Sequence, residues 1–165
     1  MSEDFRQRAV ARTKGRLYED FEVGQTFSHH WGRTITESDT VMFSTTLLHF
    51  NPLYTNRDYA KALGHPDIVV NPHLLFNVVL GLSVEDLSEL GGPFLGVFEL
   101  RYHHPIYPGT TVTARSETLE KRRSSSDPRN GIVTWRTEGF DGAGKLLIGF
   151  RRSNLARLRN PAEIR

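Results

Sequence analysis

The stretch NPHLLFNVVLGLSVEDL, residues 71–87, decides the fold. Its leucines and valines recur at the spacing of one helix face, and the apolar residues between them predict a helix that is buried nearly all round. Pro72 suits the first turn of this helix, where its missing N–H would have no intrahelical partner, and Asn71 can cap the helix. The stretch therefore predicts a long central helix around which the rest of the chain packs.

The chain beyond residues 91–93 changes to a strand pattern. Four segments rich in valine, threonine and aromatic residues follow, namely FLGVFELRYHHP, TVTARSETLEKRR, GIVTWRTEGF and KLLIGFRRSNLARL. The last two are joined by DGAG, which predicts a hairpin. SSSDPRN at 124–130 predicts a polar turn between the second and the third.

The segment before the central helix predicts one strand, roughly 25–35, and two shorter helices, roughly 37–48 and 57–63. Thr36 and Asp39 have the spacing of a capping box at the start of the first helix. Pro52 ends or kinks that helix, and Gly64 stands at the C-terminal cap of the second.

This order of elements, with one strand and several helices before at least four antiparallel strands, favours an α+β protein. It predicts a hot-dog fold, in which an antiparallel sheet wraps around a long central helix. Since such a sheet covers one side of the helix only, we expect a homodimer or a higher homo-oligomer. The domain should span residues 17–165, after a flexible basic arm over residues 1–16.

The composition is that of a globular protein, with 38% hydrophobic and 24% charged residues in a chain of 165. The net charge of +2 is too small for a nucleic-acid-binding polyelectrolyte, and no apolar run approaches the ~20 residues of a membrane span. The absence of cysteine excludes disulfides, thiolate metal sites and a cysteine nucleophile. We therefore expect a cytoplasmic protein that binds neither nucleic acid nor membrane.

Common catalytic and cofactor motifs do not occur in the sequence. The pairs His29–His30 and His103–His104 lie in expected strands, where neighbours face opposite sides, so neither pair forms a metal site alone. GGPFLG lacks the lysine of a phosphate loop, and the serines at 124–126 lack a nucleophile elbow. We expect no metal and no separate cofactor.

Residues 47–73 differ from the rest because several features converge there. LLHFNPLYTNRDYA, residues 47–60, places His49 and Tyr54 on either side of an Asn-Pro turn, and VVNP then opens the central helix. A helix N-terminus offers free N–H groups and a partial positive charge, which suit a thioester carbonyl that becomes an oxyanion.

HFNPLYTNRDYA resembles the motif of the MaoC-like (R)-specific enoyl-CoA hydratases, which runs Asp-x-Asn-Pro-aliphatic-His with a Tyr-Ala pair a few positions on. The matching positions are Asn51, Pro52, Leu53, Tyr59 and Ala60. GLSVEDLSE, LEKRRSSSDPRNGIVTWRTEGFDGAGK and LIGFRRSNL are similar to the branch that acts on mesaconyl-, methylmalyl- and itaconyl-CoA. The resemblance covers most of the chain. It implies reversible hydration or dehydration of an enoyl thioester, carried by coenzyme A or by a carrier protein, with a branched or dicarboxylic acyl group such as mesaconyl.

In that family an acid and a histidine hold one water, the histidine acts as base, and the other group delivers a proton to the α-carbon. A backbone N–H at the start of the central helix binds the enolate oxygen. This chain departs from the pattern at all of these positions. His49 stands at the acid position, Tyr54 at the histidine position, and Pro72, which has no N–H, at the helix start.

Three interpretations remain open. In the first, the pair is rearranged: His49 becomes the base, Tyr54 becomes the acid or holds the water, and Asn71 or the N–H of His73 meets the oxyanion. In the second, the domain binds an acyl thioester without hydratase activity. In the third, it is a thioesterase in which His49 activates water against the carbonyl carbon.

The resemblance also implies residues that shape the pocket. Asn51 and Pro52 would form its turn, and Phe50, Tyr59 and Phe76 would provide apolar lining.

Anion-binding groups are expected on the strands and their loops. Arg151 or Arg152 could pair with a substrate carboxylate or a CoA phosphate. Ser124 and Ser126 lie in the RRSSSDPR loop, which would bind an anion readily but is equally ordinary as a solvated loop. We interpret Arg101 as a surface cation.

Overall fold

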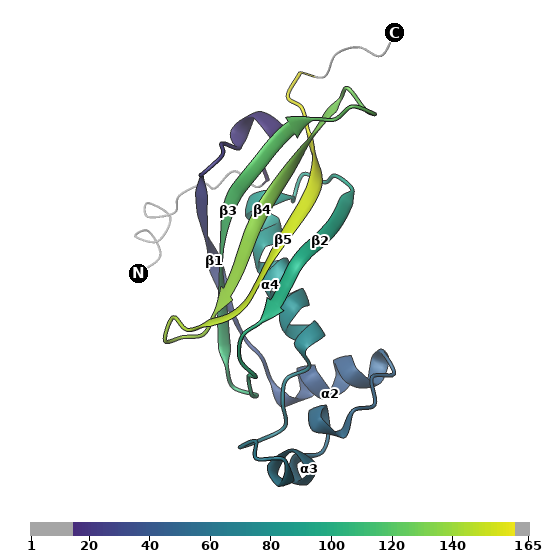
Figure 1. Cartoon of the computed structure of the whole chain (residues 1–165), viewed down its shortest axis with the longest axis vertical. Helices are drawn as coiled ribbons and strands as arrows, with labels where there is room; N and C mark the ends of the chain where they lie inside the picture. Colours follow the sequence, from purple (N-terminus) through teal and green to yellow (C-terminus); the bar gives the residue numbers. More distant parts are fainter. Residues whose placement is uncertain (1–14, 161–165) are drawn as a thin grey trace, which may run out of the picture.

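The computed structural model describes residues 15–160, and Figure 1 shows one antiparallel sheet packed against one long helix. The strands are β1 (Thr26–Thr34), β2 (Phe94–Tyr102), β3 (Thr111–Arg123), β4 (Asn130–Phe140) and β5 (Leu146–Arg157). Their order across the sheet is β1-β3-β4-β5-β2, and all neighbouring strands are antiparallel. The helices are α2 (Glu37–Thr46), α3 (Arg57–Ala62) and α4 (Pro72–Leu87), with 3-10 turns η1 (Tyr18–Asp20) and η2 (Pro52–Tyr54).

The predicted α+β hot-dog architecture is confirmed, because the sheet wraps one face of α4 while α2 and α3 lie beyond its N-terminal end (Figure 1). Each predicted helix and strand is present within a few residues of its predicted bounds. One exception concerns His103 and His104, which were predicted to lie in a strand. They follow β2, because Pro105 has no N–H to continue the ladder after the N–H of His103 donates to the carbonyl of Leu147.

Local signals explain where the helices begin. The Thr36 hydroxyl accepts from the N–H of Asp39 while the Asp39 carboxylate accepts from the N–H of Thr36, which is the predicted capping box. Asn71 caps α4 as predicted, with Pro72 in the first turn. These caps fix the direction in which α2 and α4 leave the loops around the Asn-Pro turn.

The core lies between α4 and the sheet. Its α4 members are Leu74, Leu75, Val78 and Val79, which pack with sheet residues that include Ile148 and Phe150.

The prediction that α4 is buried nearly all round is wrong. His73, Asn77 and Gly81 are exposed. They are spaced four residues apart and therefore form one stripe along the helix. The sheet covers the opposite face, so this stripe faces solvent.

Residues 1–14 of the predicted basic arm lie outside the described part of the chain. Gly15, which is described, donates its N–H to the carbonyl of Glu85 near the end of α4.

Candidate functional site

The N-terminal end of α4 carries a polar network centred on Asn71, which is fully buried. Its backbone N–H donates to the hydroxyl of Thr40 in α2 at 2.9 Å. Its side-chain amide donates to the hydroxyl of Ser44 at 3.0 Å and lies 3.1 Å from Nδ1 of His49. The side-chain oxygen accepts from the N–H of His73 at 3.0 Å. Asn71 therefore ties α2, the Asn-Pro segment and α4 together.

This network determines the tautomer of His49. Because the Asn71 oxygen accepts from a backbone N–H, the amide nitrogen must be the group that faces His49. The amide nitrogen is a donor, so Nδ1 of His49 is the acceptor and the proton of the neutral ring lies on Nε2. His49 consequently presents an N–H donor through Nε2.

Backbone geometry brings His49 to this place. Leu48 has φ +55, a left-handed conformation that turns the chain sharply out of α2. The N–H of His49 then donates to the carbonyl of Ser44 at 2.8 Å. The imidazole comes to lie against the rings of Tyr54 and His73, with centroid separations of 5.3 Å and 5.7 Å.

The first turn of α4 offers no unengaged N–H for an oxyanion. Pro72 has none, the N–H of His73 donates to the Asn71 side chain, and those of Leu74 and Leu75 donate to the Asn71 carbonyl. The N–H of His73, which the sequence suggested as an oxyanion donor, is therefore already bonded to the Asn71 side chain that caps the helix.

Tyr54 lines a cleft of about 310 Å³ beside the start of α4. The remaining wall is mainly apolar and includes Val69, Val70, Pro72 and Leu75. Burial raises the pKa of the Tyr54 phenol above its usual value, so the hydroxyl stays protonated at neutral pH. The His49 ring packs on Tyr54 but is not itself part of the cleft wall.

Sequence reasoning missed the residues at the end of β2. Tyr102, His103 and His104 line the same cleft as Leu53 and Tyr54 of the Asn-Pro segment. Burial raises the pKa of Tyr102, and the nearby Tyr54 raises it further. The signal that could have found them is the proline after the histidine pair, which ends the strand at the level of the helix start.

The other predicted pocket residues have different surroundings. The Asn51 side chain accepts from the N–H of Leu53 and so builds the turn that begins with Pro52. Phe50 is 72% exposed and Tyr59 is 44% exposed. Phe76 packs edge-on against Phe150 in the core, with ring centroids 5.1 Å apart. None of these three aromatic residues lines the cleft, and their contact with a substrate stays a prediction.

The predicted anion-binding residues are not brought together with His49 and Tyr54. Arg151 binds the carboxylates of Glu99 and Glu120. Ser124 and Ser126 bond each other in the β3–β4 turn, at the opposite end of the sheet from α2 and α3 (Figure 1).

Arg152 is only 1% exposed and points into the core over the ring of Trp135. Burial lowers the pKa of its guanidinium to about 10. Arg151 and Arg152 therefore face opposite sides of the sheet, as their alternation along β5 predicts. Their assignment to a substrate anion stays a prediction.

A second histidine network lies toward the C-terminal end of α4. Nδ1 of His29 lies 2.7 Å from the Asp86 carboxylate, and Nε2 lies 2.8 Å from the Ser116 hydroxyl, which in turn meets Thr137 at 2.9 Å. The order Asp-His-Ser is that of a hydrolase triad. Ser116 is only 2% exposed and lines neither the Tyr54 cleft nor the larger cavity at this end of α4, so it is not placed to meet a substrate.

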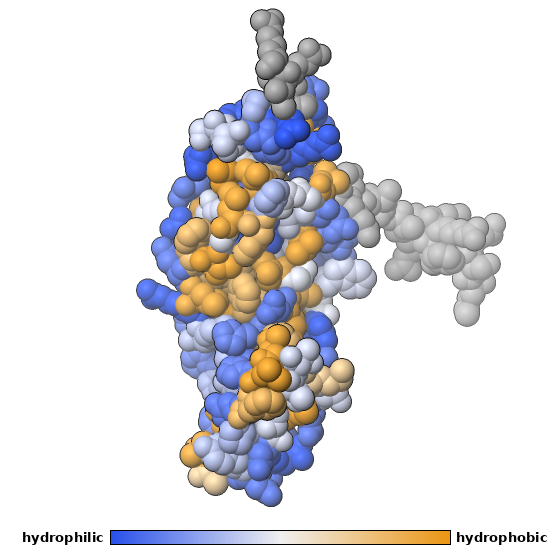
Figure 2. Space-filling view, turned by 90° about the vertical axis from the view of Figure 1, so that its right-hand side faces the viewer, coloured by the Kyte–Doolittle hydropathy of each residue, from blue (hydrophilic) through white to orange (hydrophobic). Residues whose placement is uncertain are grey.

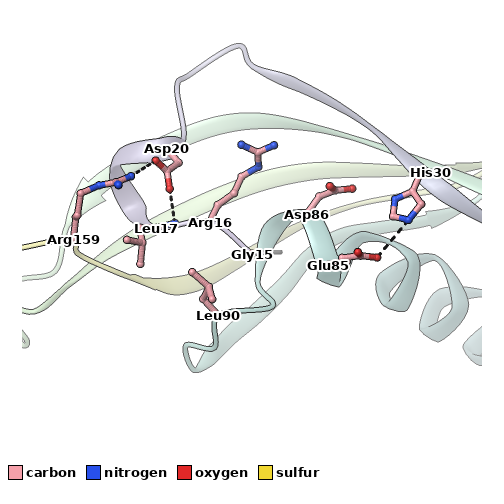
Figure 3. A pocket seen from close by; sticks show the side chains of 9 residues that line it. All are labelled: Gly15, Arg16, Leu17, Asp20, His30, Glu85, Asp86, Leu90 and Arg159. Atoms are coloured by element: carbon pink, nitrogen blue, oxygen red, sulfur yellow. Dashed lines mark hydrogen bonds and ion pairs between the residues drawn. The ribbon is translucent and has the colours of Figure 1, made fainter. Parts of the chain in front are cut away.

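A larger cavity of about 650 Å³ lies at this same end of α4. Figure 3 shows charged side chains around it, including Arg16, His30, Glu85 and Asp86. We place the candidate site at the smaller cleft, because the Asn-Pro motif and the Asn71 network border that cleft and lie away from the larger cavity.

Comparison with known proteins identifies the family and the fold. The sequence profile of the mesaconyl-CoA hydratase family matches residues 2–165. Mesaconyl-CoA hydratase of Haloarcula hispanica is 38% identical over 156 residues, which cover 94% of this chain and 44% of that protein. The solved structure of a MaoC domain dehydratase from Chloroflexus aurantiacus gives a TM-score of 0.85 at 28% identity, over 94% of this chain and 44% of that chain.

A Mycobacterium tuberculosis protein described as having a double hot-dog fold gives a TM-score of 0.79 at 22% identity. The match covers 92% of this chain and 47% of that chain, and at this identity it shows the fold alone.

The fold and the motif at the helix end define a MaoC-like hot-dog protein. More particularly, the chain belongs to the mesaconyl-CoA hydratase family. It spans about half the length of the curated relatives it matches. Among residues 15–160, no helix is long and apolar enough to cross a membrane, and no group of three or more potential ligand side chains could hold a metal ion.

Proposed function

We propose that this chain catalyses the reversible hydration and dehydration of an enoyl-CoA thioester. The observation that carries the proposal is the buried Asn71 network, which holds His49 in one tautomer against Tyr54 beside an apolar cleft. Membership of the mesaconyl-CoA hydratase family supports the reaction class. The acyl group would enter the cleft, and the thioester would lie near the start of α4.

The geometry favours a donor role for His49 over the base role that the sequence suggested. Its Nε2–H can hydrogen-bond a developing enolate oxygen, which would replace the backbone N–H that Pro72 lacks. A neutral imidazole is a suitable donor for this purpose, because it stabilises an oxyanion without transferring its proton.

Tyr54 would act as the acid. Tyr54 lines the cleft and its hydroxyl is protonated at neutral pH, so it could deliver a proton to the α-carbon. None of the described residues that line the cleft is a carboxylate. The base that accepts a proton from water would then be an imidazole of the His103–His104 pair, which lines the same cleft.

The reaction class is tested with crotonyl-CoA, mesaconyl-CoA and a 3-hydroxyacyl-CoA as substrates. Enone absorbance and free thiol are followed together in each assay. Loss of the enone without thiol release supports hydration. Thiol release would instead identify a thioesterase, and binding without either signal would identify a thioester-binding protein.

The assignment of roles is tested by restoring the family pattern. The double variant H49N/Y54H places asparagine, which has the shape of aspartate, at the acid position and histidine at the histidine position. A gain in hydration rate would show that the rest of the cleft supports the family chemistry. H103A and H104A, measured separately, should include one variant with strongly reduced turnover; full activity in both would exclude a base at the end of β2.

The finer assignments are part of the same proposal. The substrate would be dicarboxylic if an arginine such as Arg151 approaches the cleft in the assembled protein. Coenzyme A would be the carrier, and the location would be cytoplasmic. Comparing mesaconyl-CoA with crotonyl-CoA tests the second carboxylate directly, because an arginine contact should lower the KM for mesaconyl-CoA only.

A further inference from the structure

The cavity at the C-terminal end of α4 is not used by the proposed function. Its volume of about 650 Å³ is roughly twice that of the Tyr54 cleft and is typical of small-molecule sites. It borders β1 through His30, at the edge of the sheet opposite β2, so it lies away from the broad apolar face that Figure 2 shows on the β2 side. Its size and its separate position allow it to hold a ligand of its own.

The segment before η1 forms one wall of this cavity and is fixed on both sides of Arg16. The N–H of Gly15 bonds to the end of α4. Gly15 has φ +72, and a Cβ at this position would collide with the side chain of Leu90, so the close contact requires glycine. The N–H of Leu17 donates to the Asp20 carboxylate at 2.9 Å. These two anchors hold Arg16 in a defined position at the cavity.

Arg16 presents a cation to the cavity. The Cζ atom of its guanidinium lies 5.0 Å from the centroid of the Phe27 ring, and its Nε is buried without a hydrogen-bond partner. Within residues 15–160 Arg16 makes no ion pair, whereas Arg159 binds the carboxylate of Asp20 (Figure 3). A planar guanidinium that rests on an aromatic ring and lacks a partner at its edge suits a carboxylate.

Glu85 and Asp86, at the end of α4, supply acceptor oxygens to the same cavity. Oε2 of Glu85 accepts from Nε1 of Trp31 at 2.8 Å and lies 3.6 Å from Nε2 of His30. Oδ2 of Asp86 lies 2.7 Å from Nδ1 of His29. The second oxygen of each carboxylate has no hydrogen-bond partner among residues 15–160. Both carboxylates can therefore accept further hydrogen bonds from a cationic group in the cavity.

We propose that this cavity binds a free α-amino acid with an apolar side chain. The carboxylate of the ligand pairs with Arg16, and its ammonium group donates to the free oxygens of Glu85 and Asp86. The side chain of the ligand packs on Leu17 and Leu90, which line the same cavity.

The reason for choosing a zwitterion is that Arg16 and the two carboxylates line one cavity without forming an ion pair with each other. A ligand that carries both charges satisfies both sides, whereas a simple carboxylate or a simple amine leaves one side without a partner. The proposal concerns binding alone and does not rest on the proposed function.

The site is tested by isothermal titration calorimetry of the purified full chain, with L-leucine as the probe. Two matched ligands isolate the two charges. 4-Methylpentanoate is leucine without the ammonium group, and 3-methylbutylamine is leucine without the carboxylate. Each should bind at least about tenfold more weakly than L-leucine, because charge-assisted hydrogen bonds are lost.

Variants assign each charge to its side chain. R16Q should raise the Kd of L-leucine about tenfold or more and leave the Kd of 3-methylbutylamine unchanged. E85Q and D86N keep an oxygen that can accept from the present partner but remove the negative charge, so each should weaken L-leucine and leave 4-methylpentanoate unchanged. The matched control is R33Q, because Arg33 pairs with Asp39 and does not line the cavity. Circular dichroism of every variant checks that the fold is retained.

Three outcomes would overturn the proposal. In the first, none of L-leucine, L-valine, L-methionine and L-phenylalanine binds at concentrations up to about 10 mM. In the second, R16Q binds L-leucine as tightly as the wild-type chain does. In the third, 4-methylpentanoate binds as tightly as L-leucine, which would identify a site for simple carboxylates. None of these measurements uses hydratase activity, so a chain without turnover that binds L-leucine as expected would refute the proposed function and leave this site standing.

Discussion

The two ends of α4 each hold a histidine in a hydrogen-bonded network, and the two networks differ in how much of the ring they leave available. His49 at the N-terminal end is half-buried and is bonded through Nδ1, with no partner for Nε2 among residues 15–160. His29 at the C-terminal end is buried and has both nitrogens bonded, to Asp86 and Ser116. A triad-like order of residues is therefore not a site when every polar atom is satisfied internally. A ring nitrogen that stays open beside a cleft is the better indicator of chemistry.

The largest effect is expected when the imidazole of His49, at the N-terminal end of α4, is removed. H49A should lower the turnover of crotonyl-CoA by about 10²–10³-fold, because one preorganised donor to an oxyanion contributes an effect of this size. The fold should be retained, since Asn71 keeps its bonds to Thr40, Ser44 and His73. Steady-state kinetics with far-ultraviolet circular dichroism measures both. The matched control is H30A on β1, which removes an imidazole outside the cleft and should leave turnover unchanged; full activity in H49A would reject the assignment.

At the C-terminal end of α4, where both nitrogens of His29 are bonded, we expect a substitution to change the stability of the fold. H29L fills a similar volume but removes both hydrogen bonds, so the Asp86 carboxylate and the Ser116 hydroxyl lose a partner. We expect the free energy of unfolding to fall by roughly 2 kcal/mol. Urea denaturation measures it, with H30L as the control on the exposed side of the same strand. A change below about 0.5 kcal/mol would mean that the network contributes little to the fold.

The sequence predicts these two ends unequally well, for physical reasons. Capping residues and helical periodicity are local, so the start of α4, its Asn71 cap and the Thr36–Asp39 box could all be predicted. His49 and Tyr54, which stand close together in the family motif, pack with their ring centroids 5.3 Å apart, while their catalytic roles stay predictions.

Pro105 marks where β2 ends, but local signals show neither that this end of β2 borders the Tyr54 cleft nor that His29 belongs to a network. Both depend on contacts between segments far apart in the chain, such as His29 with Asp86 and with Ser116, whose separations are 57 and 87 residues. The tautomer of His49 is likewise invisible in the sequence, because it follows from which way the Asn71 amide faces.

A smaller change, at Tyr54 beside His49, separates the role of its ring from that of its hydroxyl. Y54F keeps the ring that packs on His49 and removes the hydroxyl from the cleft. We expect turnover to fall about tenfold or more, because an acid is lost, while the free energy of unfolding changes by less than about 0.5 kcal/mol. The hydroxyl makes no hydrogen bond to another described residue, so the fold does not depend on it. If turnover is unchanged, Tyr54 is a packing residue and the acid lies elsewhere.

The smallest expected effect is a pH dependence of stability that arises from His29, at the C-terminal end of α4. Burial lowers the pKa of His29 below 6.5, with the nearby charge of Arg152 acting in the same direction and Asp86 opposing both. The unfolded chain therefore binds a proton at His29 before the folded chain does. Stability from this group is fully present above pH 6.5 and is lost as the pH falls below that value toward the folded pKa.

The slope from one such group cannot exceed about 1.4 kcal/mol per pH unit. Depressed carboxyl pKa values, as at Asp39 and Asp67, act only below about pH 4 and leave this window clear. Urea denaturation between pH 7 and pH 5 should show the decline in wild type and a flatter profile in H29L. H49A should keep the wild-type decline, because the titrating group that matters for stability lies at the other end of α4. An equal flattening in H49A would show that the two ends are coupled through the helix.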